Sequence, residues 1–159
     1  MIVDAYTHIL PAGYQAMLEE KITDRDMSLN SARYAQTIPT LVDLEARFRL
    51  MDDFDEYIQV VSVASPPVHS IAPPAVAAEL CRAANDELAE MVLKYPHRFA
   101  AGIATLPMND MDAALKEAQR AIKDLRLRAV ELYTDINGQP LDAPQFMPLY
   151  EMMAEGQLK

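Results

Sequence analysis

Three polar residues stand at alternate positions near the start of the chain, where MIVDAYTHILP places Asp4, Tyr6 and His8 in an otherwise apolar run. Side chains two residues apart on a β-strand point to the same face, so these three are predicted to share one face. An imidazole is a common ligand of divalent metal ions, and a carboxylate can orient it by accepting its other ring proton. The spacing permits a metal site, but it also fits ordinary strand residues whose polar ends find backbone partners.

A second set of polar residues lies in RAVELYTD, which is predicted to be a strand. Glu131 and Tyr133 alternate along it, and Thr134 and Asp135 stand at its end. Because successive side chains point to opposite faces, one of these sets faces the interior and could line a site. The sequence does not decide which set it is.

Regular strands and helices must position these residues. Helical spacing covers residues 14–22, and the aperiodic polar stretch 23–39 is predicted to be a long loop of the kind that forms lids. A helix capped by Asp43 or Thr40 follows. The remaining predicted strands and helices alternate: strands at 57–64, 99–106 and 128–135, and helices at 74–95, from Asn109 or Asp110, and from Asp142. An Asn137-Gly138 turn precedes the last helix.

Four strand and helix units in alternation predict a parallel α/β sheet. One possibility is an open doubly wound sheet, but the chain has only four glycines and no glycine-rich phosphate-binding turn. The other is half of an eight-stranded barrel, because a complete barrel needs about 250 residues. With 159 residues, the chain can form one ordinary domain or part of a larger one.

Composition excludes several classes of function. The net charge of -10 argues against binding to a nucleic-acid backbone. Cys81 is the only cysteine, so we expect a buried structural thiol rather than a disulfide framework. We also expect no signal peptide and no membrane-spanning helix, with the cytoplasm as the default location. His97 is expected at a helix end on the surface, and no GxSxG motif supports nucleophilic hydrolysis.

Several strings resemble the amidohydrolase-related family that includes the aminocarboxymuconate-semialdehyde and resorcylate decarboxylases. They are VDAYTHILP, DLEARFRLMDDF, ANDELAEMVLKYPHRFAAGIATLPMND and NGQPLDAPQFMPLYEMMAE. The resemblance covers nearly the whole chain. It implies an α/β fold, the amino-terminal half of a TIM-type (β/α)8 barrel with four parallel βα units, and a single domain over residues 1–159. The family's opening strand usually reads Asp-x-His-x-His, so His8 matches the second histidine and Tyr6 departs from the first.

The resemblance implies a metal-dependent decarboxylase or hydrolase that acts on a small carboxylated substrate. His8 and Tyr6 would hold part of a divalent metal ion, zinc first among the expected ions, with Asp4 behind them. Arg47 would bind the substrate carboxylate through its guanidinium fork. The alternative for Arg47 is a solvated helix face that it shares with Arg49. Neither His69 nor His97 matches a family ligand.

The family carries further metal ligands on later strands, beyond the four units seen here. We therefore expect an incomplete metal shell, weak metal binding, and either a missing carboxyl-terminal half or a homo-oligomer that covers the open side. No catalytic residue can be assigned from the sequence. The alternative function is a non-catalytic truncated barrel that binds another protein through its open sheet edges. Neither nucleic acid nor membrane is expected as a partner.

Overall fold

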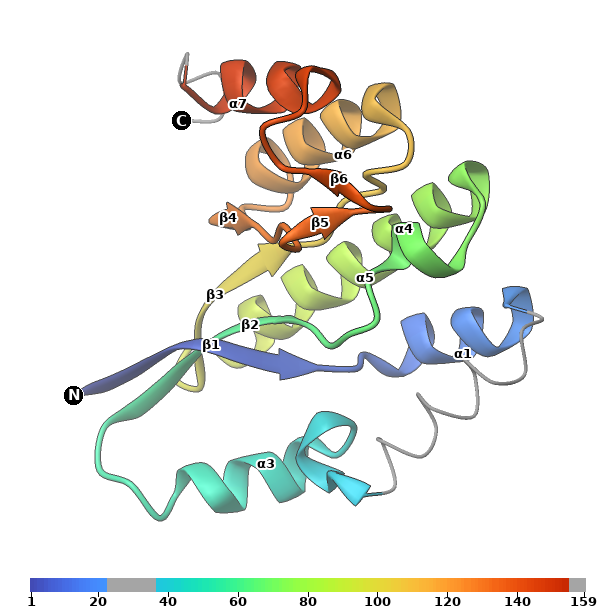
Figure 1. The fold of residues 1–159 in the computed structure, drawn as a ribbon. Helices are drawn as coiled ribbons and strands as arrows, with labels where there is room; N and C mark the ends of the chain where they lie inside the picture. The colour runs from blue at the N-terminus through green and yellow to red at the C-terminus, as the bar shows by residue number, and fades with distance from the viewer. Residues whose placement is uncertain (23–36, 155–159) are drawn as a thin grey trace.

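The computed structural model describes residues 1–22 and 37–154, and its central element is a sheet of parallel strands (Figure 1). The strands lie in the order β1-β2-β3-β4, which is also their order in the sequence. Their bounds are β1 (Ile2–Ile9), β2 (Tyr57–Val63), β3 (Phe99–Ala104) and β4 (Ala129–Val130). Sequential order of parallel strands with a helix between them is the arrangement of a (β/α)8 barrel, and four such units make the amino-terminal half of one.

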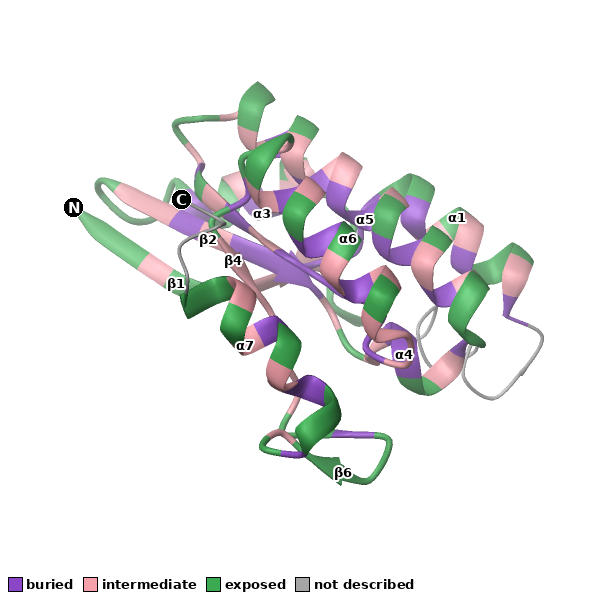
Figure 2. Cartoon of the chain, turned by 90° about the horizontal axis from the view of Figure 1, so that it is seen from above, coloured by how far each residue is buried: buried purple, intermediate pink, exposed green. Residues whose placement is uncertain are grey.

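Helices connect the strands and cover one face of the sheet. The helices are α1 (Ala12–Lys21), α3 (Leu44–Met51), α4 (Val68–Ile71), α5 (Pro74–Lys94), α6 (Met111–Lys123) and α7 (Met147–Ala154). Seen from above, α1, α3, α5 and α6 lie on the same side of the strands (Figure 2). Single 3-10 turns, η1 (Pro39–Leu41) and η2 (Pro144–Phe146), precede α3 and α7. None of the helices in the described ranges has the length and apolar character needed to cross a membrane.

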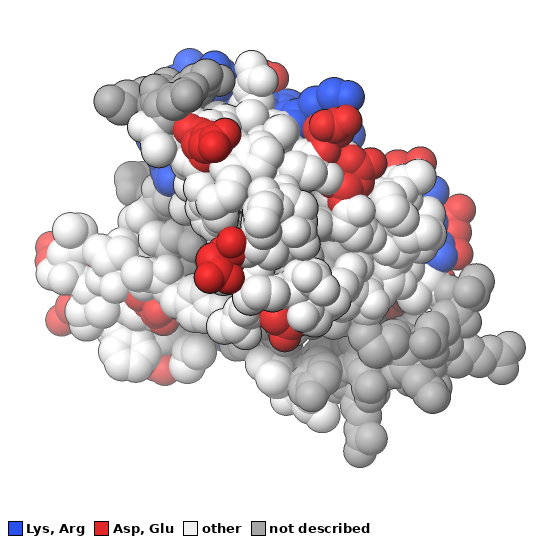
Figure 3. Space-filling model, turned by 45° about the horizontal axis from the view of Figure 1, so that its top comes forward, with Lys and Arg blue, Asp and Glu red and all other residues white. Residues whose placement is uncertain are grey.

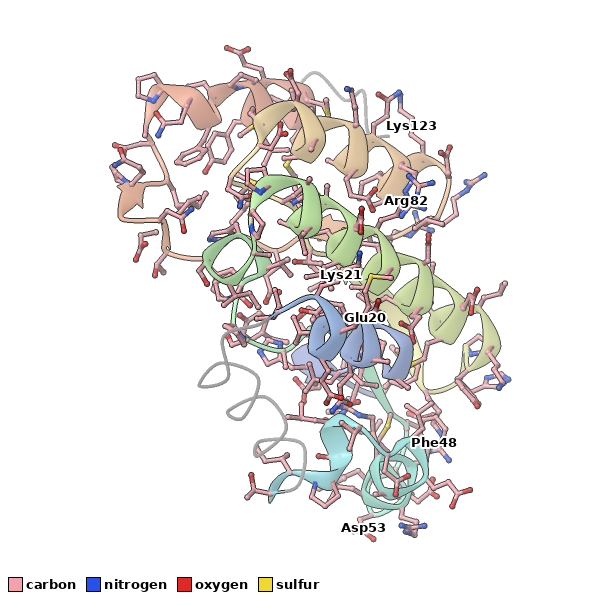
Figure 4. The ribbon with its side chains drawn as sticks, turned by 90° about the vertical axis from the view of Figure 1, so that its right-hand side faces the viewer. Glu20, Lys21, Phe48, Asp53, Arg82 and Lys123 are labelled. Carbon is pink, nitrogen blue, oxygen red and sulfur yellow. The ribbon has the colours of Figure 1, made fainter. Side chains whose placement is uncertain are left out.

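The core lies between the sheet and these helices. Val61 and Val63 of β2 pack there with Leu80, Ala84 and other buried residues of α5. Along β2, residues 59, 61 and 63 therefore point to the helix side, and the residues between them point to the inner face of the sheet. Lys21 of α1 points toward α5 (Figure 4), where it pairs with Glu79 at 2.6 Å.

Several predicted boundaries are confirmed. Asp43 caps α3 by accepting hydrogen bonds from the backbone N–H groups of Glu45 and Ala46, and Asp110 caps α6 in the same way through Ala113. Most of the predicted loop, residues 23–36, lies outside the described residues. The loop ends earlier than predicted, because Pro39 already begins η1. The short helix α4 was not predicted.

The fourth strand is shorter than its predicted span of 128–135. Only the two residues of β4 pair with β3, because β3 itself ends at Ala104. The next backbone N–H, that of Thr105, donates to Asn85 Oδ1 at 2.9 Å instead of continuing the sheet. Farther along, β5 (Asp135–Ile136) and β6 (Gln139–Pro140) form an antiparallel hairpin. Its turn is the predicted Asn137-Gly138 pair, both with positive φ.

A β-bulge interrupts the opening strand. The pairing of β1 with β2 shifts between Asp4, which lies opposite Gln59, and Thr7, which lies opposite Val61. The Thr7 hydroxyl donates to the carbonyl oxygen of Val60 at 2.9 Å beside this irregularity. One extra residue on β1 reverses the alternation of faces, so the predicted common face for Asp4 and His8 is wrong.

Candidate metal site on the inner face of the sheet

Four polar side chains meet on the inner face of the sheet. Tyr6 Oη donates to Glu131 Oε1 at 3.3 Å, and the Tyr6 and His8 rings meet edge to face with centroids 4.7 Å apart. His8 Nδ1 lies 2.9 Å from Ser62 Oγ, which donates to Glu131 Oε1 at 3.3 Å. We call these residues the inner cluster. The sequence did not decide which polar residues of RAVELYTD face the interior. The inner cluster shows that Glu131 does.

Sheet curvature brings the inner cluster together. Tyr6 belongs to β1 and Glu131 directly follows β4, so they stand at opposite edges of the four-stranded sheet. A direct contact between their side chains requires the two edges to bend toward each other across the inner face, as strands in a barrel do. Ser62 takes part because it pairs in register with His8 on the neighbouring strand.

One oxygen of the inner cluster has no partner. Glu131 Oε2 is buried and makes no hydrogen bond within the described part of the chain. Burial raises the pKa of Glu131, while His8 and the hydrogen bonds from Tyr6 and Ser62 act in the opposite direction. A buried carboxylate oxygen without a partner is costly, so Glu131 Oε2 is an unsatisfied acceptor within the inner cluster.

The hydrogen bonds permit two tautomers of the His8 ring. Ser62 has a single hydroxyl proton, and its possible acceptors are His8 Nδ1 at 2.9 Å, Glu131 Oε1 at 3.3 Å and the carbonyl oxygen of Thr7 at 3.5 Å. When Ser62 donates to Glu131, its oxygen accepts the proton of His8 Nδ1. The other ring nitrogen, Nε2, then keeps its lone pair and can bind a metal ion.

Asp4 belongs to a different group on the helix side of the sheet. Tyr57 Oη donates to Asp4 Oδ2 at 2.6 Å, and Gln59 Nε2 donates to Tyr57 Oη at 3.1 Å. Gln59 Oε1 in turn accepts from Arg47 Nη1 at 2.6 Å. Asp4 is therefore connected to His8 only through a chain of hydrogen bonds, and not by a direct contact.

Arg47 completes this helix-side group. Its side chain is only 5% exposed, so the alternative of a solvated helix face is wrong for Arg47. That alternative is correct for Arg49, which is exposed and pairs with a glutamate four residues earlier at 3.8 Å. Arg47 Nε donates to the carbonyl oxygen of Thr40 at 2.9 Å, and Nη2 donates to the carbonyl oxygen of His8. Burial lowers the pKa of Arg47, and Tyr57 and Asp4 oppose that effect.

A hollow of about 200 Å³ lies beside the inner cluster, where β2 and β4 lead into their following loops. Residues of both loops line it: Pro67, His69, Ser70, Tyr133, Thr134, Asp135 and Asn137. His69 is buried, and its ring centroid lies 6.1 Å from that of Tyr133. Carboxyl ends of barrel strands are where substrates bind, so this hollow is placed to extend the site.

Ser62 and His69 were not predicted as site residues. For Ser62 the signal was available, because a hydroxyl stands in an apolar strand expected to be covered on both faces. His69 gave no signal, since the helix that holds it is only four residues long. Within the described ranges, no group of three or more His, Cys, Asp or Glu side chains could hold a metal ion.

Comparison with known families decides what kind of barrel this is. The profile of the family described as Amidohydrolase matches residues 3–158. The chain belongs to the amidohydrolase family. Among curated relatives, the gamma-resorcylate decarboxylase of a Polaromonas species is 34% identical over 145 residues, which are 87% of this chain and 43% of that protein. The 2-amino-3-carboxymuconate-6-semialdehyde decarboxylase of Dictyostelium discoideum is 26% identical and matches 94% of this chain and 45% of its own length.

Solved structures of this amidohydrolase family have the same fold. The 5-carboxyvanillate decarboxylase of Sphingomonas paucimobilis superposes with a TM-score of 0.78 at 27% identity, over 94% of this chain and 48% of that one. A Polaromonas dihydroxybenzoic acid decarboxylase, solved with bound manganese and the inhibitor 2-nitroresorcinol, gives 0.72 at 30% identity, over 96% of this chain and 46% of that one. The chain thus spans less than half the length of the relatives it matches.

Proposed function

We propose that residues 1–159 form the amino-terminal portion of a metal-dependent decarboxylase that acts on a small carboxylated aromatic compound. The observation that carries the proposal is the inner cluster, in which His8 contacts the Tyr6 ring and is joined to Glu131 through Ser62 on the inner face of a half barrel. The named relatives of this half barrel are decarboxylases of such compounds. Hydrolysis is the alternative reaction, and the family permits both.

His8 and Tyr6 are our proposed ligands on this chain. The fit to a metal ion is partial: His8 Nε2 can bind an ion in one of the two tautomers, and the described ranges contain no group of three or more His, Cys, Asp or Glu side chains that could hold one. A bound divalent ion would supply a Lewis acid that polarises the substrate. Zinc was the first expectation from the sequence, whereas manganese is the ion in the Polaromonas relative, so both belong in any test.

Arg47 is proposed to bind the substrate carboxylate, on the strength of its place in DLEARFRLMDD, although in this half barrel it is buried on the helix side of the sheet and not in the inner cluster. The structure adds a second task, because the guanidinium donates to the backbone of His8 and to Gln59 and Thr40. Arg47 thereby holds the end of β1 against α3. Asp4 supports this arrangement through Tyr57.

The open side of the half barrel needs a partner, which we propose is the remaining half of a longer barrel or a second copy of the chain. Among the described residues, β1 pairs only with β2, and β4 only with β3. Ile2 and Val3 of β1 are 50% and 47% exposed, although both are apolar. This exposure also favours the second candidate function, a binding protein that uses its open edges. The view in Figure 3, which brings the top of Figure 1 forward, is mostly uncharged at its centre, with scattered acidic side chains and with Lys and Arg toward its edges.

Carbon dioxide release from 2,6-dihydroxybenzoate tests the proposal. The complete gene product and the 159-residue chain are each assayed with Mn²⁺ and with Zn²⁺, and metal content is measured by elemental analysis. We expect turnover by the complete product and none by the 159-residue chain alone. A complete product that holds metal but releases no carbon dioxide from any carboxylated phenol contradicts the decarboxylase assignment and favours hydrolysis or binding.

A further inference from the structure

We infer that the hollow beside the inner cluster binds the hydroxyl-bearing edge of the aromatic substrate, and that His69 is the residue that recognises the hydroxyl group. The inference rests on the proposed function, since it names the part of the same substrate that enters the hollow. The substrate carboxylate then points away from the hollow. Neither the spacing of polar residues in the sequence nor the family resemblance assigns a role to His69.

The hollow has room for one aromatic ring. Its volume is about 200 Å³, and a cavity of roughly 150 Å³ is enough for benzene. Pro67, His69 and Tyr133 are its buried or half-buried residues, whereas Ser70 and Asp135 are exposed and form its outer part. Aromatic and proline surfaces with a few polar groups around them suit a flat ring.

The hollow adjoins the inner cluster along two stretches of chain. Tyr133 follows Glu131 by two residues, and Pro67 follows Ser62 by five. Two residues of extended chain span about 7 Å. A ring bound in the hollow therefore lies next to the inner cluster, where the proposed reaction takes place.

Charge decides which part of the substrate enters the hollow. Among the described residues that line it there is no lysine or arginine, and Asp135 adds a negative charge. A carboxylate that leaves water needs charged or clustered N–H donors, so its burial here is costly. A phenolic hydroxyl is uncharged at neutral pH, and it needs only one acceptor and one donor.

His69 offers an acceptor and a donor. Within the described ranges, its ring nitrogens have no hydrogen-bond partner, although the side chain is only 5% exposed. Burial lowers the pKa of His69 against the opposing effect of Asp135, so the ring is uncharged and has one N–H donor and one acceptor nitrogen. The ring meets that of Tyr133 edge to face, with centroids 6.1 Å apart, which orients it in the hollow.

Two asparagines hold the backbone of His69 in place. The side-chain amides of Asn109 and Asn137 each donate to the carbonyl oxygen of His69 at 3.3 Å. Asn109 also donates to the carbonyl oxygen of Ala72 at 2.9 Å, so α4 is fixed to the loops that follow β3 and β4. The backbone is thus bound while the ring nitrogens stay open, which is the arrangement of a preorganised recognition residue.

Resorcinol and benzoate separate the hydroxyl groups of the substrate from its carboxylate and serve as the two probes. Each is titrated into the isotope-labelled 159-residue chain without metal, and the nuclear magnetic resonance shifts are followed. We expect resorcinol to shift the resonances of His69, Tyr133 and Asn137 to saturation, and benzoate to leave them unchanged at the same concentrations. His69→Phe keeps an aromatic ring but loses both nitrogens, so it should bind resorcinol about tenfold more weakly. His97→Gln, at an exposed position, is the control and should bind as the unaltered chain does.

Three results overturn the inference: resorcinol shifts only residues outside the hollow or none, benzoate binds in the hollow as tightly as resorcinol, or a folded His69→Phe binds resorcinol unchanged. If His69→Phe does not fold, the comparison of the two probes on the unaltered chain decides. Carbon dioxide release by the longer protein judges the proposed function separately. Release without resorcinol binding leaves that function intact and removes the inference, whereas selective resorcinol binding without release removes the function and leaves the hollow as a site for phenols.

Discussion

Two carboxylates in this molecule differ in how completely the chain satisfies them. Glu117, on the helix side between α5 and α6, is only 7% exposed, and both of its oxygens are bound. Asn85 donates to it at 2.7 Å, and Arg120 donates through Nη2 at 2.8 Å and through Nε at 2.9 Å. Glu131, on the inner face, has two long bonds to one oxygen and none to the other.

This difference in hydrogen bonding indicates that Glu117 stabilises the fold and that Glu131 belongs to the proposed site. The bonds of Glu117 tie α5 and α6 to the end of β3, because Asn85 also binds both backbone groups of Thr105. Every group in that network is used to hold the fold. Glu131 is kept near its place by Tyr6 and Ser62 but remains incompletely satisfied, which a fold tolerates where a ligand completes the set.

The largest expected effect comes from breaking the satisfied site. Arg120→Ala leaves Glu117 buried without its cation, which should lower the free energy of unfolding by about 3–5 kcal/mol. Arg82→Ala is the matched control, because Arg82 also lies on the helix layer but points outward (Figure 4). It should change stability by less than about 0.5 kcal/mol. Urea denaturation of both variants measures the difference in unfolding free energy. Equal losses would contradict the claim that the bonds of Glu117 to Arg120 hold the fold.

Substitution of Arg47 tests whether this residue stabilises the fold, as Glu117 does, or serves the proposed site, as Glu131 does. Arg47→Ala leaves three acceptors without their donor and should destabilise the chain on the order of 3 kcal/mol. Arg49→Ala, two residues along the same helix and exposed, serves as the control. If Arg47 binds the substrate as proposed, its loss should also raise the Michaelis constant of the longer protein about tenfold. A stable Arg47→Ala enzyme with an unchanged constant would assign Arg47 to neither task.

The sequence predicted the helix-side elements well, because local patterns determine them. The apolar runs of β2 and β3 and the helical spacing of α5 predicted these elements, and Asp43 and Asp110 were each one of two cap candidates. These features depend on short-range interactions. They do not depend on how distant parts of the chain are arranged.

The inner cluster could be predicted only in part, because it depends on pairing between distant strands. The bulge after Asp4 exists only relative to β2, and no period in the β1 sequence reveals it. Glu131 was a candidate, but its face depended on the register of β4 and on the curvature that brings it to Tyr6. His8 was a candidate from its type and spacing, and the family resemblance favoured it as a ligand. Ser62 offered a signal as a hydroxyl in an apolar strand, but the sequence did not show that it lies beside His8 on the neighbouring strand.

A smaller effect of opposite sign is expected at Glu131. Without metal, Glu131→Gln replaces a partly buried charge by a neutral amide, so the free energy of unfolding should rise by about 1 kcal/mol. Glu151→Gln should leave it unchanged, since that side chain is exposed. Thermal unfolding in the presence of a chelator measures both. A loss of stability in Glu131→Gln would mean that this carboxylate, like Glu117, serves the fold.

The smallest expected effect concerns His69, which lies in the hollow beside the inner cluster. Burial lowers its pKa, and the nearby Asp135 acts against that shift. The unfolded chain therefore binds a proton more readily than the folded chain in the range just below the ordinary histidine pKa, so stability rises with pH there. The contribution of neutral His69 is complete above about pH 6.5 and is lost as the pH falls toward its folded pKa. His69→Gln should flatten the decline in unfolding free energy between about pH 7 and about pH 5, whereas His97→Gln, at an exposed position, should not. If both variants keep the full slope, the His69 ring is not held neutral by the fold, and the hollow offers the site no uncharged imidazole.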